Sequence, residues 1–310
     1  MIKFPLLTGE TMPAIGLGTW GSNGDEGEAA IEYAVQSGYR LFDLSSYYGN
    51  QDEVGRAFRK LIPAIVKRED LCILGKLWNA SHRAAAAETE FETTLEQLGL
   101  EYLDVYLMHW PVAMAQTKPP IIDHGVTVVE TWLTMQKFAE TGKVKTLGVS
   151  NFNVEQLKKL VELTGIKPAV NQIEIHPYFS QPGLVEYCQS EGIHVMAYLP
   201  MGGRPSVARL LADPVIKELT EKYPGTTPAN IVLNWGVGRG YSVIPKSVKQ
   251  ERISSNLKLY SLTPEDMQKI NGLNENKRIV IPHVLASLQW PIDVFGEEAE
   301  KHLETKVIIE

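Results

Sequence analysis

The chain has 310 residues, a formal net charge of −7, 44% hydrophobic residues and 22% charged residues. This composition is ordinary for a folded protein and argues against disorder, while the acidic balance, without a long run of Lys or Arg, argues against nucleic-acid binding. No apolar run approaches the roughly 18 residues of a membrane span, and the first residues lack the apolar core of a signal peptide, so we expect a cytoplasmic protein without membrane contact.

The first predicted element is a short hairpin, with its turn formed by the segment Thr8–Thr11. Eight short apolar runs then predict strands. They are Ala14–Gly18, Leu41–Asp43, Leu71–Gly75, Val105–His109, Thr146–Ser150, Ala169–Ile175, His194–Tyr198 and Ser242–Ile244. The stretches between them predict helices, since apolar side chains recur at helical spacing over 128–139, with Gly142 as the expected cap. Thr263 and Pro264 mark the start of another helix.

Strands that alternate with helices are typical of a parallel sheet. Eight such units in a chain of this length favour an α/β fold of the (β/α)8 TIM barrel type over two separate domains. We therefore predict one barrel domain over residues 1–310, opened by the N-terminal β-hairpin. The stretch 275–310 carries prolines and an acidic segment, and we expect it to form a C-terminal tail over the active-site face.

Polar side chains stand where neighbouring strands of the predicted barrel end. Asp43 ends the second run, Lys76 follows the third, His109 ends the fourth, and Tyr48 lies in the loop after the second. Such barrels build their active sites at the C-terminal ends of the strands, so we expect these four side chains to meet at one mouth. Each residue alone is more often a packing residue, a cap or half of a structural ion pair, whereas the four together indicate a catalytic site.

This set of side chains suits one kind of chemistry. A phenol is a weak acid at neutral pH, but a neighbouring ammonium stabilises its phenolate and lowers its pKa. Asp43 would hold the ammonium of Lys76 in place, and the imidazole of His109 would orient a carbonyl oxygen. Tyr48 could then protonate a developing alkoxide, which is the proton transfer that carbonyl reduction by hydride requires.

Two other motifs point to different folds but fit less well. Residues 16–21 match G-x-G-x-x-G, and Asp43 follows about 20 residues later, as in a Rossmann fold. Against that fold, Trp20 is bulky where the backbone must approach a pyrophosphate. The eight predicted strand–helix units also exceed the six strands expected of a Rossmann fold. Residues 148–152 nearly match a nucleophile elbow but lack its second glycine. The two cysteines form no Cys-x-x-Cys pair and no Cys/His cluster has zinc spacing, so we expect reduced thiols and no metal.

Short segments along nearly the whole chain form one further pattern. They are Gly16–Trp20, Phe42–Asp43, Tyr48–Asn50, Gly75–Trp78, Met108–Pro111, Gly148–Phe152, Val170–Gln172, Ala197–Tyr198 and Ile244–Ser247, followed by Arg252 and Asn256. In this order and spacing they resemble the aldo-keto reductase superfamily, in its branch of aldose, aldehyde and xylose reductases. The resemblance implies a (β/α)8 barrel that reduces aldehydes and ketones with NADPH and needs no metal.

The resemblance also implies roles for single residues. Tyr48 would be the proton donor, Lys76 the residue that lowers its pKa, Asp43 the partner of that lysine, and His109 the residue that orients the substrate. The residues expected to bind the cofactor are Thr19, Trp20, Asp43, Ser150, Asn151, Gln172, Tyr198, Lys246, Ser247, Arg252 and Asn256.

Within this set, each group would bind a different part of NADPH. Ser150, Asn151 and Gln172 would hold the carboxamide of the nicotinamide, Tyr198 would stack on its ring, and Asn256 would contact the adenine. Lys246, Ser247 and Arg252 would bind the 2′-phosphate, and two cations with a hydroxyl suit a phosphate.

The substrate is expected to be a small or sugar-like carbonyl compound that binds against Trp20, Tyr48, His109 and Trp110. Trp290 in the tail is a further candidate for this pocket. The same residues serve the reverse reaction, so an NADP-dependent polyol dehydrogenase is an alternative, and so is an NADPH-binding sensor or subunit with slow turnover. Family habit suggests a monomer or a weak homodimer.

The chain departs from the family pattern at a few positions. The family often has Asp-Thr-Ala after the second strand, where this chain has Asp43, Leu44 and Ser45. Leu199 removes a hydroxyl that could contact the pyrophosphate, and Ser255 stands where many relatives have an acidic residue. None of the four expected catalytic positions departs.

Overall fold

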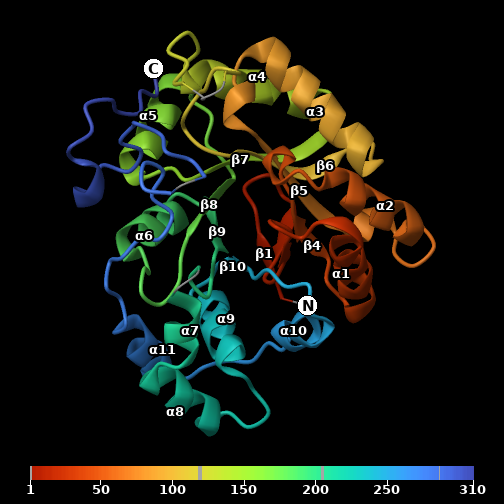
Figure 1. Ribbon diagram of the computed structural model, residues 1–310, viewed down its shortest axis with the longest axis vertical. Coiled ribbons are helices and arrows are strands. Elements are labelled where there is room, and N and C mark those ends of the chain that lie inside the picture. Colours follow the sequence, from red (N-terminus) through yellow and green to blue (C-terminus); the bar gives the residue numbers. More distant parts are fainter. Residues whose placement is uncertain (1, 118–120, 204–205, 286) are drawn as a thin grey trace.

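The computed structural model describes residues 2–117, 121–203, 206–285 and 287–310. Its centre is an eight-stranded parallel sheet that curls into a nearly closed barrel, with helices around the outside (Figure 1). The strands are β3 (Leu17–Gly18), β4 (Leu41–Asp43), β5 (Cys72–Leu77), β6 (Leu103–Met108), β7 (Val144–Ser150), β8 (Val170–Glu174), β9 (His194–Tyr198) and β10 (Ser242–Ile244). The order β10-β9-β8-β7-β6-β5-β4-β3 follows the chain, which confirms the predicted (β/α)8 TIM barrel.

The seam between the first and last strands closes the barrel. Gly16 N donates to Val243 O at 3.0 Å, Val243 N donates to Ala14 O at 2.9 Å, and Gly18 N donates to Pro245 O at 3.0 Å. The run predicted as a strand over 14–18 is therefore only partly a β3 strand. Its first residues form an isolated bridge with β10, because their hydrogen bonds cross the seam before the ladder with β4 begins.

The N-terminal hairpin is present, but its predicted turn was wrong by a few residues. Strands β1 (Lys3–Pro5) and β2 (Thr11–Pro13) pair antiparallel, with Pro5 opposite Thr11. Thr11 is thus a strand residue. The turn covers 6–10 and is closed by a bond of 2.9 Å from Leu6 N to Glu10 O, and Gly9 adopts a positive φ of 85° that favours glycine there.

The helices of the outer layer are α1 (Gly24–Ser37), α2 (Gln51–Leu61), α3 (Ala84–Leu98), α4 (Val128–Glu140), α5 (Val154–Thr164), α6 (Pro182–Ser190), α7 (Ser206–Leu211), α8 (Pro214–Lys222), α9 (Pro228–Gly238), α10 (Gln250–Asn256) and α11 (Pro264–Asn271). Helix α11 begins as predicted, because Thr263 accepts a bond from Asp266 N and Pro264 occupies the first turn. Helix α4 ends one residue earlier than predicted: Thr141 is its cap, and Gly142 follows with a φ of 75°.

The core has two parts. One lies between the barrel and its helices, and contains the buried apolar faces of α3 and α4, including Phe91, Trp132 and Met135. The other fills the barrel itself, and there Met12 of the hairpin packs with Leu41 and Leu74. In the part of the chain that the structure covers, no helix is both long enough and apolar enough to cross a membrane.

The residues after α11 form a tail that runs past α6 and α5 on one side of the barrel (Figure 1, dark blue). The carboxylate of Glu174, at the end of β8, accepts the backbone N–H groups of Ile279 at 2.7 Å and Val280 at 2.8 Å. Further along, Trp290 packs edge-to-face against Trp110, with ring centroids 5.2 Å apart. These contacts confirm that the tail lies over the predicted active-site face.

Candidate active site

The site is built on a buried ion pair between Asp43 and Lys76. Asp43 is paired with Leu74 across the β4–β5 ladder, and Lys76 lies two residues beyond Leu74, so both polar side chains stand on the same face. Lys76 Nζ donates to Asp43 Oδ1 at 2.6 Å, to Leu44 O at 3.1 Å and to Tyr48 Oη at 3.0 Å. All three ammonium hydrogens are thereby used, which compensates for the burial of the charge.

The loop after β4 fixes the position of Tyr48. Residues Ser46–Tyr48 form a short 3₁₀ helix, and Gly49 ends it with a φ of 66°. Asn50 then ties the loop to the first strand, because its side-chain amide donates to Thr19 O at 2.8 Å and Ser22 O at 2.9 Å. The short helix before Gly49 and the bonds of Asn50 after it together hold the phenol of Tyr48 against the ammonium of Lys76.

His109 lies beside Tyr48 at the end of β6. Its backbone N–H donates to Leu77 O at 3.1 Å, which continues the ladder with β5. The imidazole ring stands edge-to-face to the ring of Tyr48, with centroids 5.9 Å apart, and to that of Trp78, at 5.1 Å. Its Nδ1 lies 3.1 Å from Oγ of the buried Ser45.

Burial controls the protonation of this group. It raises the pKa of Tyr48 well above that of an ordinary phenol, and the negative charge of Asp43 adds to the effect. Burial also lowers the pKa of Lys76, while Asp43 opposes this shift. It lowers the pKa of His109 well below that of an ordinary imidazole, with the charge of Lys76 acting in the same direction. The net shift of the Tyr48 pKa is therefore upward, and the role expected for Lys76, to lower that pKa, stays a prediction.

A second set of polar side chains continues from the ion pair across the barrel. Gln172 Nε2 donates to Asp43 Oδ1 at 2.8 Å, and Ser150 Oγ donates to Gln172 O at 2.8 Å. Asn151 has a φ of 64°, and its side chain donates to His109 O at 3.0 Å and accepts from Tyr198 Oη at 2.7 Å. The four residues expected around the nicotinamide are thus joined to the expected catalytic residues in one network. This network cannot be read from the sequence, because its members come from β4, β7, β8 and β9 and from the residues that follow β6 and β7.

The residues expected around the 2′-phosphate follow β10 and extend into α10. Lys246 forms a bridge with Gly18 of β3, and its Nζ donates to Gly21 O at 3.2 Å. Ser247 Oγ accepts Lys249 N at 3.1 Å. Arg252 is exposed on α10, and within the described ranges no carboxylate pairs with it. Asn256 is buried at the end of the same helix.

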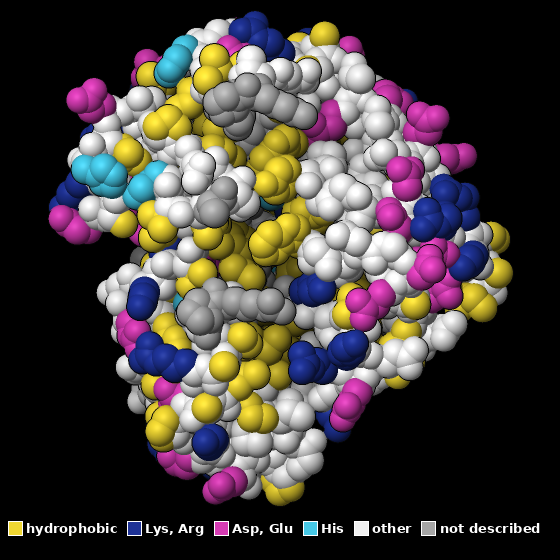
Figure 2. Space-filling model, viewed as in Figure 1, with side chains coloured by type: hydrophobic (Ala, Val, Ile, Leu, Met, Phe, Trp, Pro, Cys, Tyr) yellow, Lys and Arg dark blue, Asp and Glu magenta, His cyan; other side chains and the backbone are white. Residues whose placement is uncertain are grey.

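The first strand brings this region next to the ion pair. Thr19 is buried, and its Oγ1 donates to Asp43 O at 2.9 Å. The following residue, Trp20, is 59% exposed and stands on the rim. Figure 2 shows a hollow at the centre of this face, lined by hydrophobic side chains and bordered by Lys and Arg.

Aromatic side chains from the barrel and the tail stand on the side of His109. Trp110 is only 4% exposed, since Trp290 and Phe295 of the tail cover it at centroid distances of 5.2 and 6.0 Å. Trp78 stacks on Tyr47 at 3.6 Å and also contacts Trp290 at 6.0 Å. Trp290 therefore reaches the aromatic cluster beside the site. The sequence did not predict that Phe295 lies in this cluster. It stands there only as one apolar residue in a stretch without periodicity.

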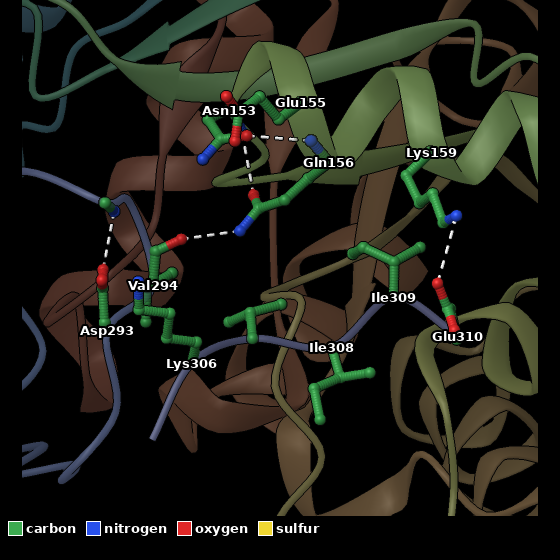
Figure 3. A pocket seen from close by; sticks show the side chains of 12 residues that line it. Asn153, Glu155, Gln156, Lys159, Asp293, Val294, Lys306, Ile308, Ile309 and Glu310 are labelled. Atoms are coloured by element: carbon green, nitrogen blue, oxygen red, sulfur yellow. Dashed lines mark hydrogen bonds and ion pairs between the residues drawn. The ribbon is translucent and has the colours of Figure 1, made fainter. Parts of the chain in front are cut away.

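Side chains at the start of α5 hold the tail in this position. Gln156 Nε2 donates to Val294 O at 2.6 Å, and Asn153 Nδ2 donates to Phe295 O at 3.2 Å. Figure 3 shows Asn153, Gln156 and Val294 among the residues around a cavity of about 460 Å³ between α5 and the tail. The cavity is separate from the network around Lys76. Among the described residues, no three His, Cys, Asp or Glu side chains gather as metal ligands would.

Comparisons with known proteins agree with this geometry. The chain matches the family model described as "Aldo/keto reductase family" over residues 14–275. It is 40% identical over 295 residues to the human protein aldo-keto reductase family 1 member A1, covering 89% of this chain and 90% of that one. It is 41% identical over 288 residues to aldose reductase B of Dictyostelium discoideum, covering 87% and 92% of the two chains.

A solved structure has the same architecture. The aldose reductase of Schistosoma japonicum superposes with a TM-score of 0.87 at 36% identity, covering 96% of this chain and 99% of that one. The family model spans most of the chain, and the relatives and this structure match it almost end to end. The chain therefore belongs to the aldo/keto reductase family of oxidoreductases.

Proposed function

We propose that the protein reduces a small or sugar-like aldehyde, or a ketone, to the alcohol with NADPH, and that Tyr48 donates the proton. The observation that carries the proposal is the buried ammonium of Lys76, which bonds to Asp43 and Tyr48 at once. The contact of 3.0 Å places a phenol, a group that can donate a proton, directly against the charged ammonium.

The residues present suit a phosphorylated nicotinamide dinucleotide. Ser150, Asn151 and Gln172 offer hydroxyl and amide groups for a carboxamide beside the ion pair, and Tyr198 offers a ring. At the β10–α10 end, the exposed Arg252 lies near Lys246 and Ser247 in sequence, and this donor set suits a dianionic phosphate. When bound, NADPH supplies the hydride that the carbonyl carbon accepts.

The protein's own part is the transfer of a proton. Because burial raises its pKa, Tyr48 is protonated at neutral pH and can give its hydroxyl proton to the oxygen of the reduced carbonyl. The ammonium of Lys76 then stabilises the phenolate that remains, and Asp43 keeps the ammonium charged. The neutral imidazole of His109 offers a hydrogen bond that orients the carbonyl oxygen.

The surroundings of the site favour small substrates with both polar and apolar parts. Trp20 on the rim provides an apolar surface, the buried Trp110 lies beneath the tail, and Tyr48 and His109 provide the polar groups. The tail contributes to the wall from residues far along the chain, which supports a single functional unit over 1–310. A monomer or weak homodimer in the cytoplasm remains our prediction.

The proposal is tested by the initial rate of NADPH consumption with DL-glyceraldehyde, with NADH measured in parallel. We expect turnover that prefers NADPH. Binding of NADPH without turnover on aldehydes, ketones or polyols would contradict the reductase and favour the sensor alternative. Turnover with polyols and NADP⁺ alone would favour the dehydrogenase direction.

A further inference from the structure

We propose that Ser45 is a positioning residue for the reaction: its hydroxyl holds His109 in the tautomer that carries the proton on Nε2. The proposal deepens the proposed function and rests on it for the role of His109. It concerns the serine that follows the second strand of this chain, two residues after Asp43.

The contact between the two residues is buried and well defined. Ser45 follows β4 two residues after Asp43, in an extended conformation, and is fully buried. Its Oγ lies 3.1 Å from Nδ1 of His109, a residue 64 positions further along the chain. A hydrogen bond between two buried groups fixes the rotation of the imidazole ring as well as its position.

The hydrogen bonds of Ser45 decide which way its proton points. Tyr47 N donates to the same Oγ at 3.3 Å, so the oxygen already accepts one bond as the cap of the 3₁₀ helix. Among the described residues, the hydroxyl hydrogen of Ser45 has one acceptor, Nδ1 of His109. The serine therefore donates, and Nδ1 accepts with its lone pair.

The tautomer follows from this direction. Burial and the charge of Lys76 lower the pKa of His109, so the imidazole is neutral and carries one proton. With Nδ1 accepting from Ser45, that proton sits on Nε2. Among the described residues the side-chain hydrogen bond of His109 uses Nδ1 and leaves Nε2 available, so its N–H can donate to a bound carbonyl oxygen. An alanine at position 45 would leave Nδ1 without this donor and both tautomers accessible.

The first test observes the tautomer directly. Protein labelled with ¹⁵N-histidine is examined by two-bond ¹H–¹⁵N correlation spectra, with His109→Gln used to assign the His109 signals. We expect a non-protonated Nδ1 and a protonated Nε2 in the native protein. A spectrum with the proton on Nδ1 would overturn the proposal, whether or not the protein turns over any aldehyde.

The second test removes the hydroxyl. In Ser45→Ala we expect mixed tautomer signals and a fall in kcat of about 3- to 10-fold, the size of one lost hydrogen bond, with the Kd for NADPH unchanged. The matched control is Ser46→Ala, which removes the adjacent hydroxyl that donates to Glu90 at 2.7 Å and does not contact His109. The control should keep the native His109 spectrum.

The outcomes separate this proposal from the proposed function. Native His109 signals and native kcat in Ser45→Ala would overturn the role of Ser45 while leaving the reductase intact. A native protein with the expected tautomer but no turnover would overturn the function and leave the Ser45–His109 contact established. If Ser45→Ala fails to fold, Ser45→Cys, which keeps the shape and a weak donor, takes its place with a smaller expected loss.

Discussion

At the scale of single residues, the chemistry depends on what surrounds the ammonium of Lys76. A buried charge is tolerated only when its hydrogen-bonding capacity is filled, and here a carboxylate, a carbonyl and a phenol fill it. Two of these partners are structural, while the third is a group that can exchange a proton. The same contacts that make the charge tolerable also connect it to Tyr48.

The pKa shifts around this ammonium predict a flat pH profile. Burial keeps His109 neutral below the ordinary imidazole pKa and keeps Tyr48 protonated above neutral pH. We therefore expect kcat for aldehyde reduction to stay level from about pH 6 to about pH 8, a range that includes the ordinary imidazole pKa of about 6.5. Measuring kcat for aldehyde reduction at several pH values across this range checks the prediction. A fall in kcat on acidification that disappears in His109→Gln would show that His109 titrates there.

Arg252 carries a prediction about the choice of cofactor. Arg252 is exposed and forms no ion pair among the described residues, so its charge is available for a phosphate. Arg252→Ala should raise the Kd for NADPH by about tenfold or more, the size of one charge-assisted hydrogen bond. It should raise the Kd for NADH by much less. Fluorescence titration gives both Kd values. Lys258→Ala, which removes a charge just beyond α10, is the control, and equal losses of NADPH and NADH in Arg252→Ala would contradict the 2′-phosphate assignment.

The residues of the ion pair could be predicted from the sequence, and their environment could not. Asp43, Lys76 and His109 stand at strand ends, a position that follows from the alternation of strands and helices. The direction of the pKa shift of Tyr48 depends on how many atoms cover the phenol, which a strand pattern does not contain. The bond between Ser45 and His109 depends on the rotation of one ring, so only the structure reveals it.

At the scale of elements, the predicted strands differ from the observed ones mostly at their ends. Strands β4, β9 and β10 have the predicted limits, while β5, β6 and β7 are longer. Apolar character locates the buried centre of a strand, whereas its ends are set by the ladder with its neighbours. Lys76 illustrates this, since it lies inside β5 because the bonds to β6 continue past Gly75.

The contact between β9 and β10 predicts an acid-sensitive stability. His194 Nε2 lies 2.8 Å from Ser242 Oγ, whose hydroxyl donates to Pro13 O, so the neutral imidazole donates to the serine. Burial lowers the pKa of His194 to about 4. The unfolded chain, with a histidine pKa near about 6.5, binds a proton more tightly than the folded one, so the free energy of unfolding falls as the pH drops below about 6.5.

Urea unfolding at a series of pH values measures this effect. His194 alone contributes a slope of at most about 1.4 kcal/mol per pH unit between the two pKa values. In His194→Gln, which keeps a donor toward Ser242, we expect a shallower decline over the same range. An identical decline in the variant and the native protein would contradict the assignment to His194.

At the scale of the whole molecule, the barrel brings together side chains that are far apart in sequence. Gln172 and Asp43 are 129 residues apart and share a hydrogen bond of 2.8 Å. The tail was predicted only as a covering segment, because it has no periodicity. Its path is set instead by side chains of the barrel, such as Glu174, that bind its backbone. Such contacts depend on the finished fold.

The central claim is that this assembly makes Tyr48 the proton donor, and steady-state NADPH consumption with DL-glyceraldehyde in Tyr48→Phe tests it most directly. The control is Tyr106→Phe, which makes the same chemical change at a buried hydroxyl of β6 without a described partner. We expect Tyr48→Phe to lose at least about 100-fold in kcat while its Kd for NADPH stays native, and Tyr106→Phe to keep its activity. Native turnover in Tyr48→Phe would contradict the account.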